Sequence, residues 1–440
     1  MWGRIGLNFD IDKMGVSLAP VCGEGLEKDL KKAFKYKIAK MNRESEKFLF
    51  QTLNLCRHLY NCALEERITA YKNNKITMSG YEQKRELVEV KNNFPEYKKA
   101  DAAVYQNVIL NLDKSYKNFF RRVKQGNEKP GFPKFKSRKK FKSFRLNWTG
   151  YKLNGKWIYM TKRKDILGKY KLHLHRPILG KIKTVQFVFE NNSWWVVFSC
   201  DNVPENPYPK TGKAVGIDVG IKSFCVDSDN HIIQNPKYYH NSIKKLNKKQ
   251  RALARKKRGS NRRKQCVREL AGIHNKIKNQ RNYFLHCTSK YYVENYEHIT
   301  VEKLKIKNLQ KNKRGTKENP REHGSVARKK VLSRNIADAG WGKFFELVEY
   351  KSTEHGRIFE KIPPHNTTQI CSQCGEKVQK KLKDRVHNCP YCGLVIDRDY
   401  NAAINIKNKS DNQAEQALTT PVVVCKPCTN VDKQLKLISV

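Results

Sequence analysis

Acidic residues and long apolar stretches are both scarce in this 440-residue sequence. No apolar run approaches the roughly 18 residues that a membrane-spanning helix needs. The N-terminal segment has only a short apolar patch, which Asp10 and Asp12 precede, so we expect no signal peptide. These features predict a cytoplasmic protein without a membrane partner.

The shortage of acidic residues leaves a large excess of positive charge. The chain has 90 Lys and Arg against 41 Asp and Glu, a formal net charge of +49. Such a charge would strain a compact fold by self-repulsion unless a polyanion neutralised it. Nucleic acid is therefore the expected partner, and a membrane surface is the weaker alternative because no basic amphipathic helix has a free apolar face. The hydrophobic content of 38% still predicts a folded chain of two or three domains.

The 13 cysteines do not indicate disulfides. Their number is odd, and a reducing compartment suits the apolar, core-like contexts of several of them: Cys56, Cys62, Cys200 and Cys225. Cys425 and Cys428 form a C-x2-C pair that has no second pair near it. We interpret that pair as part of a tail without a redox role.

Two further C-x2-C pairs form knuckles at Cys371, Cys374, Cys389 and Cys392. Each knuckle is followed by a glycine, Gly375 or Gly393, that can take the positive φ of a tight thiolate turn. This spacing predicts a ribbon that holds one structural Zn²⁺, and four buried free cysteines are the disfavoured alternative. Asp397 and Asp399 follow directly, at the head of a helical pattern.

The first half of the chain combines strand and helix patterns. Residues 1–31 have no firm pattern and are interpreted as an N-terminal extension. Within residues 32–203, one strand-like run is followed by helical spacing at about 43–126, with Asn42 or Ser45 as the expected cap. Short alternating runs come next, with WIYM, KLHLH, TVQFVFE and WWVVFSC as expected strands. This order predicts a small β-barrel that a helical subdomain interrupts.

Two basic segments are candidates for nucleic-acid binding. In the first, phenylalanines alternate with the cations, which suits phosphate contacts combined with ring contacts to bases or sugars better than a solvated loop. Its candidate contacts are Lys134, Lys136, Arg138, Lys139 and Lys140. The second segment, at about 242–290, predicts a helical hairpin that lies along a phosphate backbone. Its candidate contacts are Arg255, Lys256, Lys257, Arg258, Arg262 and Arg263.

A proline-rich linker at 204–213 separates the first half from a different pattern. A buried strand ends at Asp218, and a turn and a second strand follow it. Further on, Glu302 lies in the middle of another short strand. A polar stretch from Asn308 to about Gly324 is interpreted as a lid-like loop, and one helix is expected over Val331–Tyr350.

Three carboxylates far apart in this sequence form a candidate catalytic set: Asp218, Glu302 and Asp399. A nuclease of the ribonuclease H class needs such a set to hold two Mg²⁺ ions, about 3.5–4 Å apart, that activate water and stabilise the leaving oxygen. Each acid alone has an ordinary alternative, as a turn residue, an exposed strand charge or a helix cap. Oxygen ligands suit Mg²⁺ and thiolates suit Zn²⁺, so the two kinds of site should not compete.

Several motifs in a fixed order resemble the transposon-encoded TnpB family, compact relatives of type V CRISPR effectors. They are CRHLYNCALEER, GFPKFKSRKKFKSFRL, VGIDVG, ITVEKL, SRNIADAGWGKF, the CSQCG and CPYCG knuckles, and DRDYNAAINI. The resemblance covers about residues 32–407. It implies an RNA-guided DNA endonuclease, in which guide pairing identifies the target and the protein recognises shape and a short adjacent motif.

The resemblance also implies a multidomain α+β architecture. A wedge β-barrel at 32–203 with its helical insertion would precede a RuvC-like, ribonuclease H-like α/β domain at 214–362. A zinc-ribbon target-nucleic-acid-binding module at 363–395, a last RuvC segment at 396–409 and a disordered tail at 410–440 would follow. Asp218, Glu302 and Asp399 would bind Mg²⁺, with Asp399 preferred to Asp397 because it stands directly before x-N-A-A.

The resemblance further implies a guide RNA from the transposon end and target DNA as partners. We expect a monomer in the RNA complex, associated with the prokaryotic nucleoid. Two alternatives remain open. One is a nuclease that acts in transposition without RNA, and the other is a nuclease-inactive or unguided zinc-ribbon DNA-binding protein, a transposition accessory or transcriptional regulator. Retention of all three acids argues against a decayed nuclease.

Overall fold

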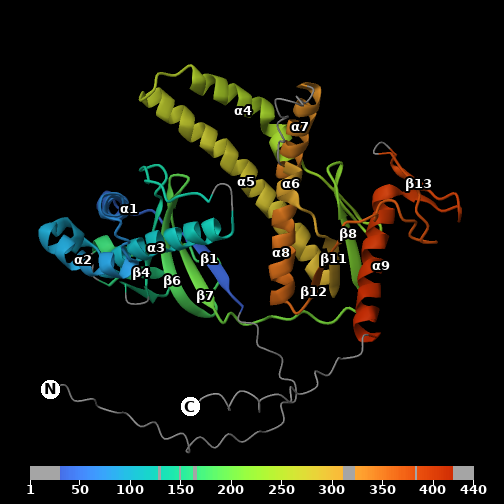
Figure 1. Cartoon of the computed structure of the whole chain (residues 1–440), viewed down its shortest axis with the longest axis horizontal. Helices are drawn as coiled ribbons and strands as arrows, with labels where there is room; N and C mark the ends of the chain where they lie inside the picture. The colour runs from blue at the N-terminus through green and yellow to red at the C-terminus, as the bar shows by residue number, and fades with distance from the viewer. Residues whose placement is uncertain are drawn as a thin grey trace, which may run out of the picture.

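The computed structural model describes residues 30–126, 130–147, 150–161, 166–310, 323–381 and 384–419. Most of the expected N-terminal extension, most of the expected lid-like loop and the Cys425–Cys428 pair lie outside these residues. Within the described part of the chain, every helix is too short or too polar to span a bilayer. Figure 1 shows two units side by side, with a long helical hairpin projecting above them.

The first unit is built on two antiparallel sheets. The larger sheet has the strand order β1-β7-β6-β2, from β1 (Lys32–Lys37), β2 (Ser143–Leu146), β6 (Lys181–Glu190) and β7 (Ser193–Asp201). The smaller has the order β3-β4-β5, from β3 (Tyr151–Asn154), β4 (Trp157–Met160) and β5 (Lys169–Lys171). An isolated bridge between Ile38 and Leu172 joins them. The expected closed barrel is not confirmed, and of the expected strand KLHLH only Lys171 lies in a strand.

Three α-helices are inserted between β1 and β2, as predicted: α1 (Arg43–Asn74), α2 (Gly80–Asn93) and α3 (Ala102–Lys124). Polar caps set where they begin, because the first backbone N–H groups of a helix have no partner within it. The side chain of Asn42 accepts from the Ser45 N–H at the start of α1, and Ser79 and Glu82 form a capping box on α2. The apolar faces of α1 and α3 share one core with the larger sheet.

The second unit is built on a five-stranded mixed sheet of order β10-β9-β8-β11-β12. Strands β8 (Ala214–Val219), β9 (Ser223–Asp227) and β10 (Ile232–Gln234) are antiparallel, whereas β11 (His298–Glu302) and β12 (Ile358–Ile362) run parallel to β8. Residues 204–213, expected as a linker, contain no helix or strand. Glu302 is the last residue of its strand, whereas it was expected in the middle.

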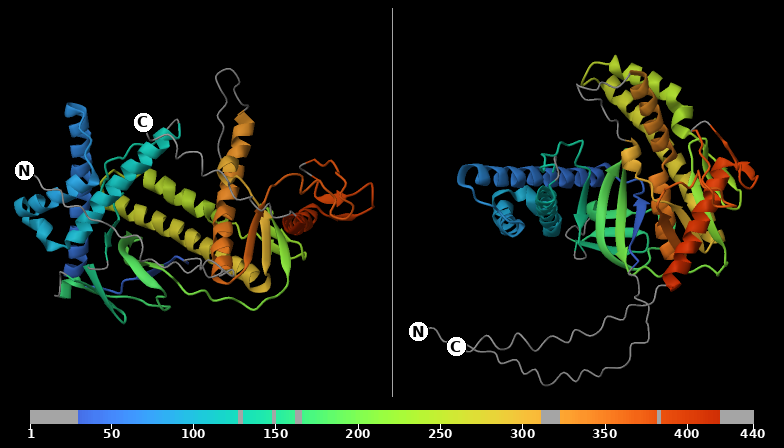
Figure 2. Two further views of the ribbon diagram at one scale, coloured as in Figure 1. Left: turned by 60° about the horizontal axis from the view of Figure 1, so that its bottom comes forward. Right: turned by 45° about the vertical axis from the view of Figure 1, so that its right-hand side comes forward.

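Helices cover both faces of this sheet (Figure 2). On one face, α5 (Asn261–Asn295) and α8 (Trp341–Glu354) pack against apolar side chains of β8, β9 and β11. On the other face lies α9 (Arg398–Thr419), which contacts β8. Helix α9 approaches β8 so closely that a Cβ at Gly216 would lie 2.2 Å from the carbonyl oxygen of Ala403. Only glycine at position 216, the first glycine of VGIDVG, lets α9 pack this close to β8.

Two sequence predictions about helices are wrong. The single helix expected over Val331–Tyr350 is two helices, α7 (His323–Ala339) and α8, because Gly340 between them adopts a φ of +77°. Helix α9 continues to Thr419, so the segment expected to end at residue 409 is longer than predicted. The basic hairpin forms as expected from α4 (Tyr238–Ala254) and α5, and a short α6 (Ile306–Gln310) follows β11.

Most of the cysteines expected in the core are buried there, namely Cys56, Cys200 and Cys225. Cys62 is an exception, because it lies on the exposed side of α1. After β12 the chain forms a small ribbon around β13 (Val386–Asn388) and β14 (Val395–Asp397), which are antiparallel. This ribbon leads directly into α9.

Candidate active site and metal centre

Side-chain alternation along two parallel strands places Asp218 and Glu302 on the same face of the second sheet. Val215 and Ile217 of β8 belong to the core under α5 and α8, so Asp218 points to the opposite face, toward α9. In β11, Val301 points to that same core and Glu302 points away from it. Since Val301 pairs with Ile217, the two acids that follow are neighbours in register.

The third acid of the predicted set comes from the first turn of α9. The backbone N–H groups of Asp399 and Tyr400 both donate to Oδ1 of Asp397, at 2.8 and 3.2 Å. Asp397 is therefore occupied as the cap of this helix, which is the ordinary role for an acid at a helix start. Asp399 lies inside the helix, half-buried, and does not cap it.

Glu302 and Asp399 both lie near enough to Asp218 to oppose its ionisation. Burial raises the pKa of Asp218 well above its ordinary value, and the negative charges of Glu302 and Asp399 raise it further. The positive charge of Arg398 acts in the opposite direction. A bound cation would offset this negative charge around Asp218.

Neighbouring side chains hold two of these acids. The Thr367 hydroxyl donates to Oε1 of Glu302 at 2.5 Å. Arg398 donates to Oδ1 of Asp399 through Nε at 3.0 Å and Nη2 at 2.9 Å, and Arg385 lies 3.9 Å from its Oδ2. Sequence reasoning missed Thr367 and Arg398. Arg398 stands beside Asp399 in the DRD segment, but nothing in that spacing shows which way its side chain turns.

The four knuckle cysteines come together as predicted. Their sulfur atoms all lie within 4.8 Å of one another, and the Cys371–Cys392 and Cys374–Cys389 Sγ pairs are both 3.6 Å apart. A tetrahedral ion with metal–sulfur bonds of about 2.3 Å would set its ligands about 3.8 Å apart. The four thiols can therefore hold a metal ion with little adjustment.

Local backbone geometry prepares this metal centre. Gly375 and Gly393 have φ values of +80° and +76°, and their N–H groups donate to the carbonyl oxygens of Cys371 and Cys389 at 3.0 Å. Burial opposes ionisation of Cys389, but backbone N–H groups and neighbouring thiols donate to its sulfur and lower its pKa to about 7. The turn glycines thus have the role predicted for them.

Two asparagines of the DRDYNAAINI segment fasten the ribbon to α9. Asn401 accepts from the backbone N–H of Ser372 at 3.0 Å and donates to the carbonyl oxygen of Ile370 at 2.8 Å. Asn405 donates to the carbonyl oxygens of Thr367 and Ile370, at 2.9 and 2.7 Å. Both asparagines are buried. The knuckle and the acid on α9 are therefore held as one piece.

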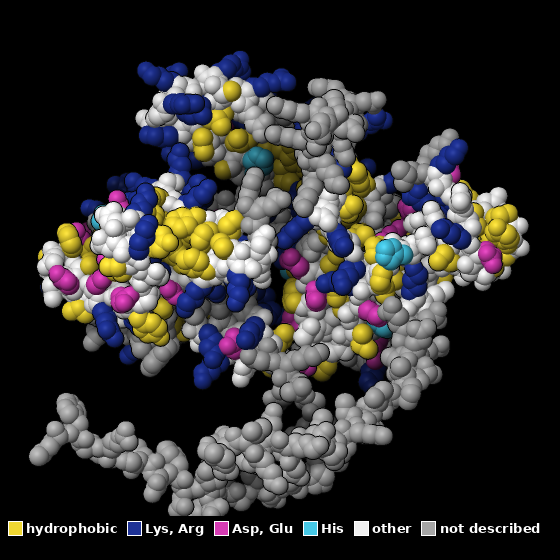
Figure 3. Space-filling view, in the orientation of Figure 1, with side chains coloured by type: hydrophobic (Ala, Val, Ile, Leu, Met, Phe, Trp, Pro, Cys, Tyr) yellow, Lys and Arg dark blue, Asp and Glu magenta, His cyan; other side chains and the backbone are white. Residues whose placement is uncertain are grey.

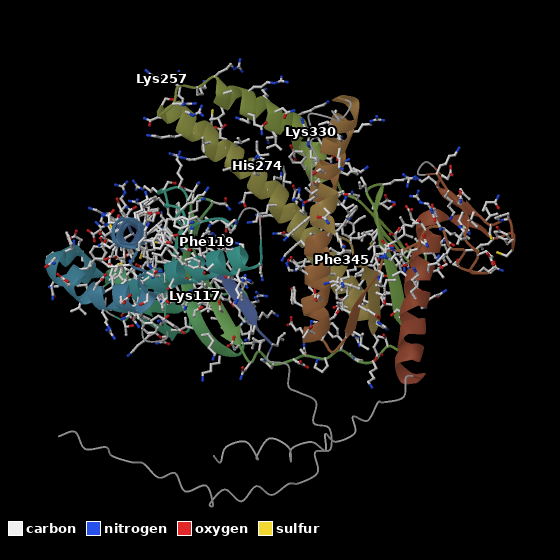
Figure 4. All side chains as sticks on the ribbon, in the orientation of Figure 1. Lys117, Phe119, Lys257, His274, Lys330 and Phe345 are labelled. Atoms are coloured by element: carbon white, nitrogen blue, oxygen red, sulfur yellow. The ribbon has the colours of Figure 1, made fainter. Side chains whose placement is uncertain are left out.

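The expected nucleic-acid contacts lie on two basic surfaces. Lys and Arg side chains gather over the tip of the α4–α5 hairpin (Figure 3), where Figure 4 labels Lys257. Eight of the eleven candidates are exposed: Lys134, Arg138, Lys139, Lys140, Arg255, Lys257, Arg258 and Arg262. Lys136, Lys256 and Arg263 are half-buried. Arg263 donates through Nη1 to the carbonyl oxygens of Leu253 and Lys256, at 2.7 and 3.1 Å, so it holds the turn of the hairpin.

Comparison with known families gives three matches. A family described as "Probable transposase" matches residues 197–313. One described as "Cas12f1-like, TNB domain" matches residues 341–406, and one described as "Helix-turn-helix domain" matches residues 30–75. The second of these spans α8, the cysteine ribbon and the start of α9.

Individual proteins and structures are similar over most of the chain. A Streptomyces pristinaespiralis protein named "Putative RNA-guided DNA endonuclease" is 29% identical, over 86% of this chain and 89% of its own length. The Escherichia coli K12 protein "Putative RNA-guided DNA endonuclease InsQ" is 28% identical, over 68% of this chain and 72% of its own. A structure of a Cas12f1-sgRNA-target DNA complex has a TM-score of 0.52 at 13% identity, over 87% of this chain and 99% of that chain, a likeness of fold alone.

Proposed function

Because the chain belongs to the TnpB family, we propose that it is an RNA-guided DNA endonuclease of a transposon. It binds a structured guide RNA and hydrolyses phosphodiesters of the target DNA. The observation that supports this proposal best is that Asp218 and Glu302 lie in register on the sheet face that α9 covers, with Asp399 in the first turn of α9, beside a four-cysteine cluster. A DNA-binding regulator without nuclease activity would not need the three acids.

The second unit suits a RuvC-like nuclease domain. A ribonuclease H-like assignment of residues 214–362 and 396–409 is supported by three antiparallel strands continued by two parallel ones, with helices on both faces. Residues 363–395 would be the zinc-ribbon module that binds target nucleic acid. Residues 32–203 would be the wedge, with the recognition insertion at about 43–126.

The acid cluster fits divalent cations. Burial and then the charges of Glu302 and Asp399 raise the pKa of Asp218, and a cation bound to these oxygen ligands would favour its ionised form. We assign Asp218, Glu302 and Asp399 as ligands of two Mg²⁺ ions. Bound there, Mg²⁺ supplies an activated water and a positive charge at the leaving oxygen. The thiol cluster is assigned to one structural Zn²⁺, for which its donor set and sulfur spacing are suitable.

The remaining polar groups of the site position these acids. Thr367 orients Glu302 through its hydroxyl. Arg398 holds Asp399 from within its own helix, and its guanidinium also donates to the carbonyl oxygen of Asp384 in the ribbon, at 3.1 Å. We propose that these contacts keep the carboxylates in one arrangement before DNA arrives, which reduces the reorganisation needed for cutting.

The partners follow from the charge and from the family. The exposed cations on the α4–α5 hairpin and around residue 138 would neutralise the phosphates of the guide RNA and the target DNA. We propose that one protein molecule acts in each RNA complex, in the cytoplasm of a prokaryote and close to the nucleoid.

Cleavage by the reconstituted complex tests this function. The protein is purified from cells carrying its locus, the RNA that accompanies it is sequenced, and a matching DNA target is supplied with Mg²⁺. Asp218→Ala should abolish cutting while RNA binding stays unchanged. Glu346→Ala, a change to an exposed acid that forms a surface ion pair with Lys343, serves as the control and should cut normally. Undiminished cutting by the Asp218 variant would refute the assigned site.

A further inference from the structure

A groove in the helical insertion is not used by the function described so far. It lies between the C-terminal half of α1, the start of α2 and the C-terminal half of α3, and its volume is about 850 Å³. This volume is within the range of ligand pockets, about 300–1,000 Å³. In the space-filling view a contiguous hydrophobic patch lies over α3, where Figure 4 labels Phe119 (Figure 3).

Aromatic rings form the wall of this groove. Tyr116 and Phe119 each lie edge-on to Phe132, with ring centroids 5.5 and 5.2 Å apart, and Phe120 is 5.2 Å from Phe119. Phe120 is 55% exposed, and Tyr71 on the facing helix α1 is 58% exposed. Rings left open to solvent in this way are not needed to fill a core, but they offer flat surfaces on which another ring can stack.

One polar group in the groove lacks a partner. Arg67 lines the groove with its side chain only 6% exposed. Its Nε donates to Gln83 at 2.7 Å and its Nη1 to Asp113 at 3.4 Å, but Nη2 is buried and has no hydrogen-bond partner among the residues that the structure describes. Buried donors are nearly always paired, because an unpaired one is destabilising. The Arg67 guanidinium instead lies over the ring of Tyr116, 5.1 Å from its centroid, and so supports the aromatic wall of the groove.

Positive charge surrounds the opening. Lys72 and Lys117 both line the groove and are exposed, and Lys117 lies 3.0 Å from Asp113. Lys117 and Arg67 hold the pKa of Asp113 below its ordinary value against the effect of burial, so that this acid stays ionised and balances Arg67. Lys72 is exposed at the rim, and Lys117 is exposed beside Asp113, so a phosphate can approach both. Exposed rings with cations at the rim match the base and the phosphates of a nucleotide.

We infer that this groove binds an unstacked base of the guide RNA. The base stacks on Phe120 and Tyr71, and the flanking phosphates lie near Lys72 and Lys117. Loops of RNA present unstacked bases, whereas a base of duplex DNA must first be unpaired and flipped. The RNA is therefore the partner, and this inference rests on the proposed function.

Affinity for the RNA that accompanies the protein tests the inference. Phe120→Ala and Tyr71→Ala remove exposed rings and should weaken binding by about 5- to 150-fold each, the range for loss of one base–aromatic stack. Phe94→Ala is the matched control, since Phe94 is a 53% exposed ring of the same insertion outside the groove, and its affinity should not change. Equal melting temperatures of the free proteins would show that the variants fold alike.

Ultraviolet crosslinking of the wild-type complex identifies the bound base. We expect an RNA nucleotide attached to the segment of α3 that contains Phe119 and Phe120. Unchanged affinity of both variants, a loss equal to that of Phe94→Ala, or crosslinks to target DNA alone would each overturn the inference while leaving guided cleavage intact. Wild-type protein that retains no RNA would overturn both this inference and the proposed function.

Discussion

A single methyl group at position 216 should separate the acid on α9 from the two acids on the sheet. In Gly216→Ala the new Cβ would lie 2.2 Å from the carbonyl oxygen of Ala403 and 2.5 Å from the backbone nitrogen of Lys407. Real Cβ atoms essentially never approach closer than 3.0 Å, so α9 must move away by at least 0.8 Å. Neither obstacle is a flexible side chain, because both belong to the helix backbone.

This displacement sets the size of the expected effect. Asp399 lies one turn before Ala403 on α9 and moves with the helix. A misplacement of about 1 Å in a catalytic arrangement can reduce the rate by roughly 10²-fold, and overpacking of this kind destabilises by about 1–3 kcal/mol. We therefore expect Gly216→Ala to cut DNA about 10²-fold more slowly, with a lower melting temperature and normal RNA binding.

Single-turnover cleavage with saturating RNA and Mg²⁺ measures this loss. Gly272→Ala is the control, because Gly272 lies in helix α5 and a methyl group there would have open space around it, with no obstructing atom of the described residues within 4 Å. Alanine there should preserve cutting and stabilise the helix by about 0.5–1 kcal/mol. Wild-type cutting and melting by Gly216→Ala would refute the close contact between α9 and β8 on which the site depends.

Two further predictions concern the junction between the units and the thiol cluster. Lys278 and Lys35 donate to Glu190, at 2.8 and 2.5 Å, and lower its pKa from 4.5 to about 2. A lowered pKa means that Glu190 stabilises the fold above about pH 4.5 and that this contribution is lost as the pH falls toward 2. Glu190→Gln should therefore lower the melting temperature at pH 7, by an amount that shrinks on acidification, and a difference independent of pH would contradict this. Cys389→Ser should lose zinc and stability, since a structural zinc contributes to folding. Cys62→Ser changes an exposed thiol outside the ribbon and should keep both zinc and stability. Elemental analysis that finds the same zinc content in the Cys389 and Cys62 variants would disprove the assignment of the four thiols to zinc.

Patterns confined to short segments were predictable from the sequence. The two knuckles lie where their spacing placed them, and Asn42 caps α1 as one of the two residues expected to do so. The helix break at Gly340 was missed, because a glycine within a helical pattern can either continue the helix or end it. In the fold this glycine lies against Arg281 and Leu285, which are distant in sequence, and a Cβ there would be 3.3 Å from each of them.

Side-chain direction was the part of the site that the sequence left open. Nothing along the chain shows that Arg398 turns toward Asp399, or that Thr367 reaches Glu302. The same is true of the groove, where Arg67 on α1 meets rings from α3. Folding brings these residues into contact from segments that are far apart in the sequence.

The sequence by itself determined the charge, the four-cysteine cluster and the order of the segments, because composition and local spacing are properties of the chain alone. Tertiary structure decided which acids meet. Asp218 and Glu302 share a face only because β8 and β11 are parallel and in register, and Asp399 joins them only because Gly216 lets α9 lie against β8. Pairing of strands and contact between backbones arise from packing of the whole domain, and no single segment carries that information.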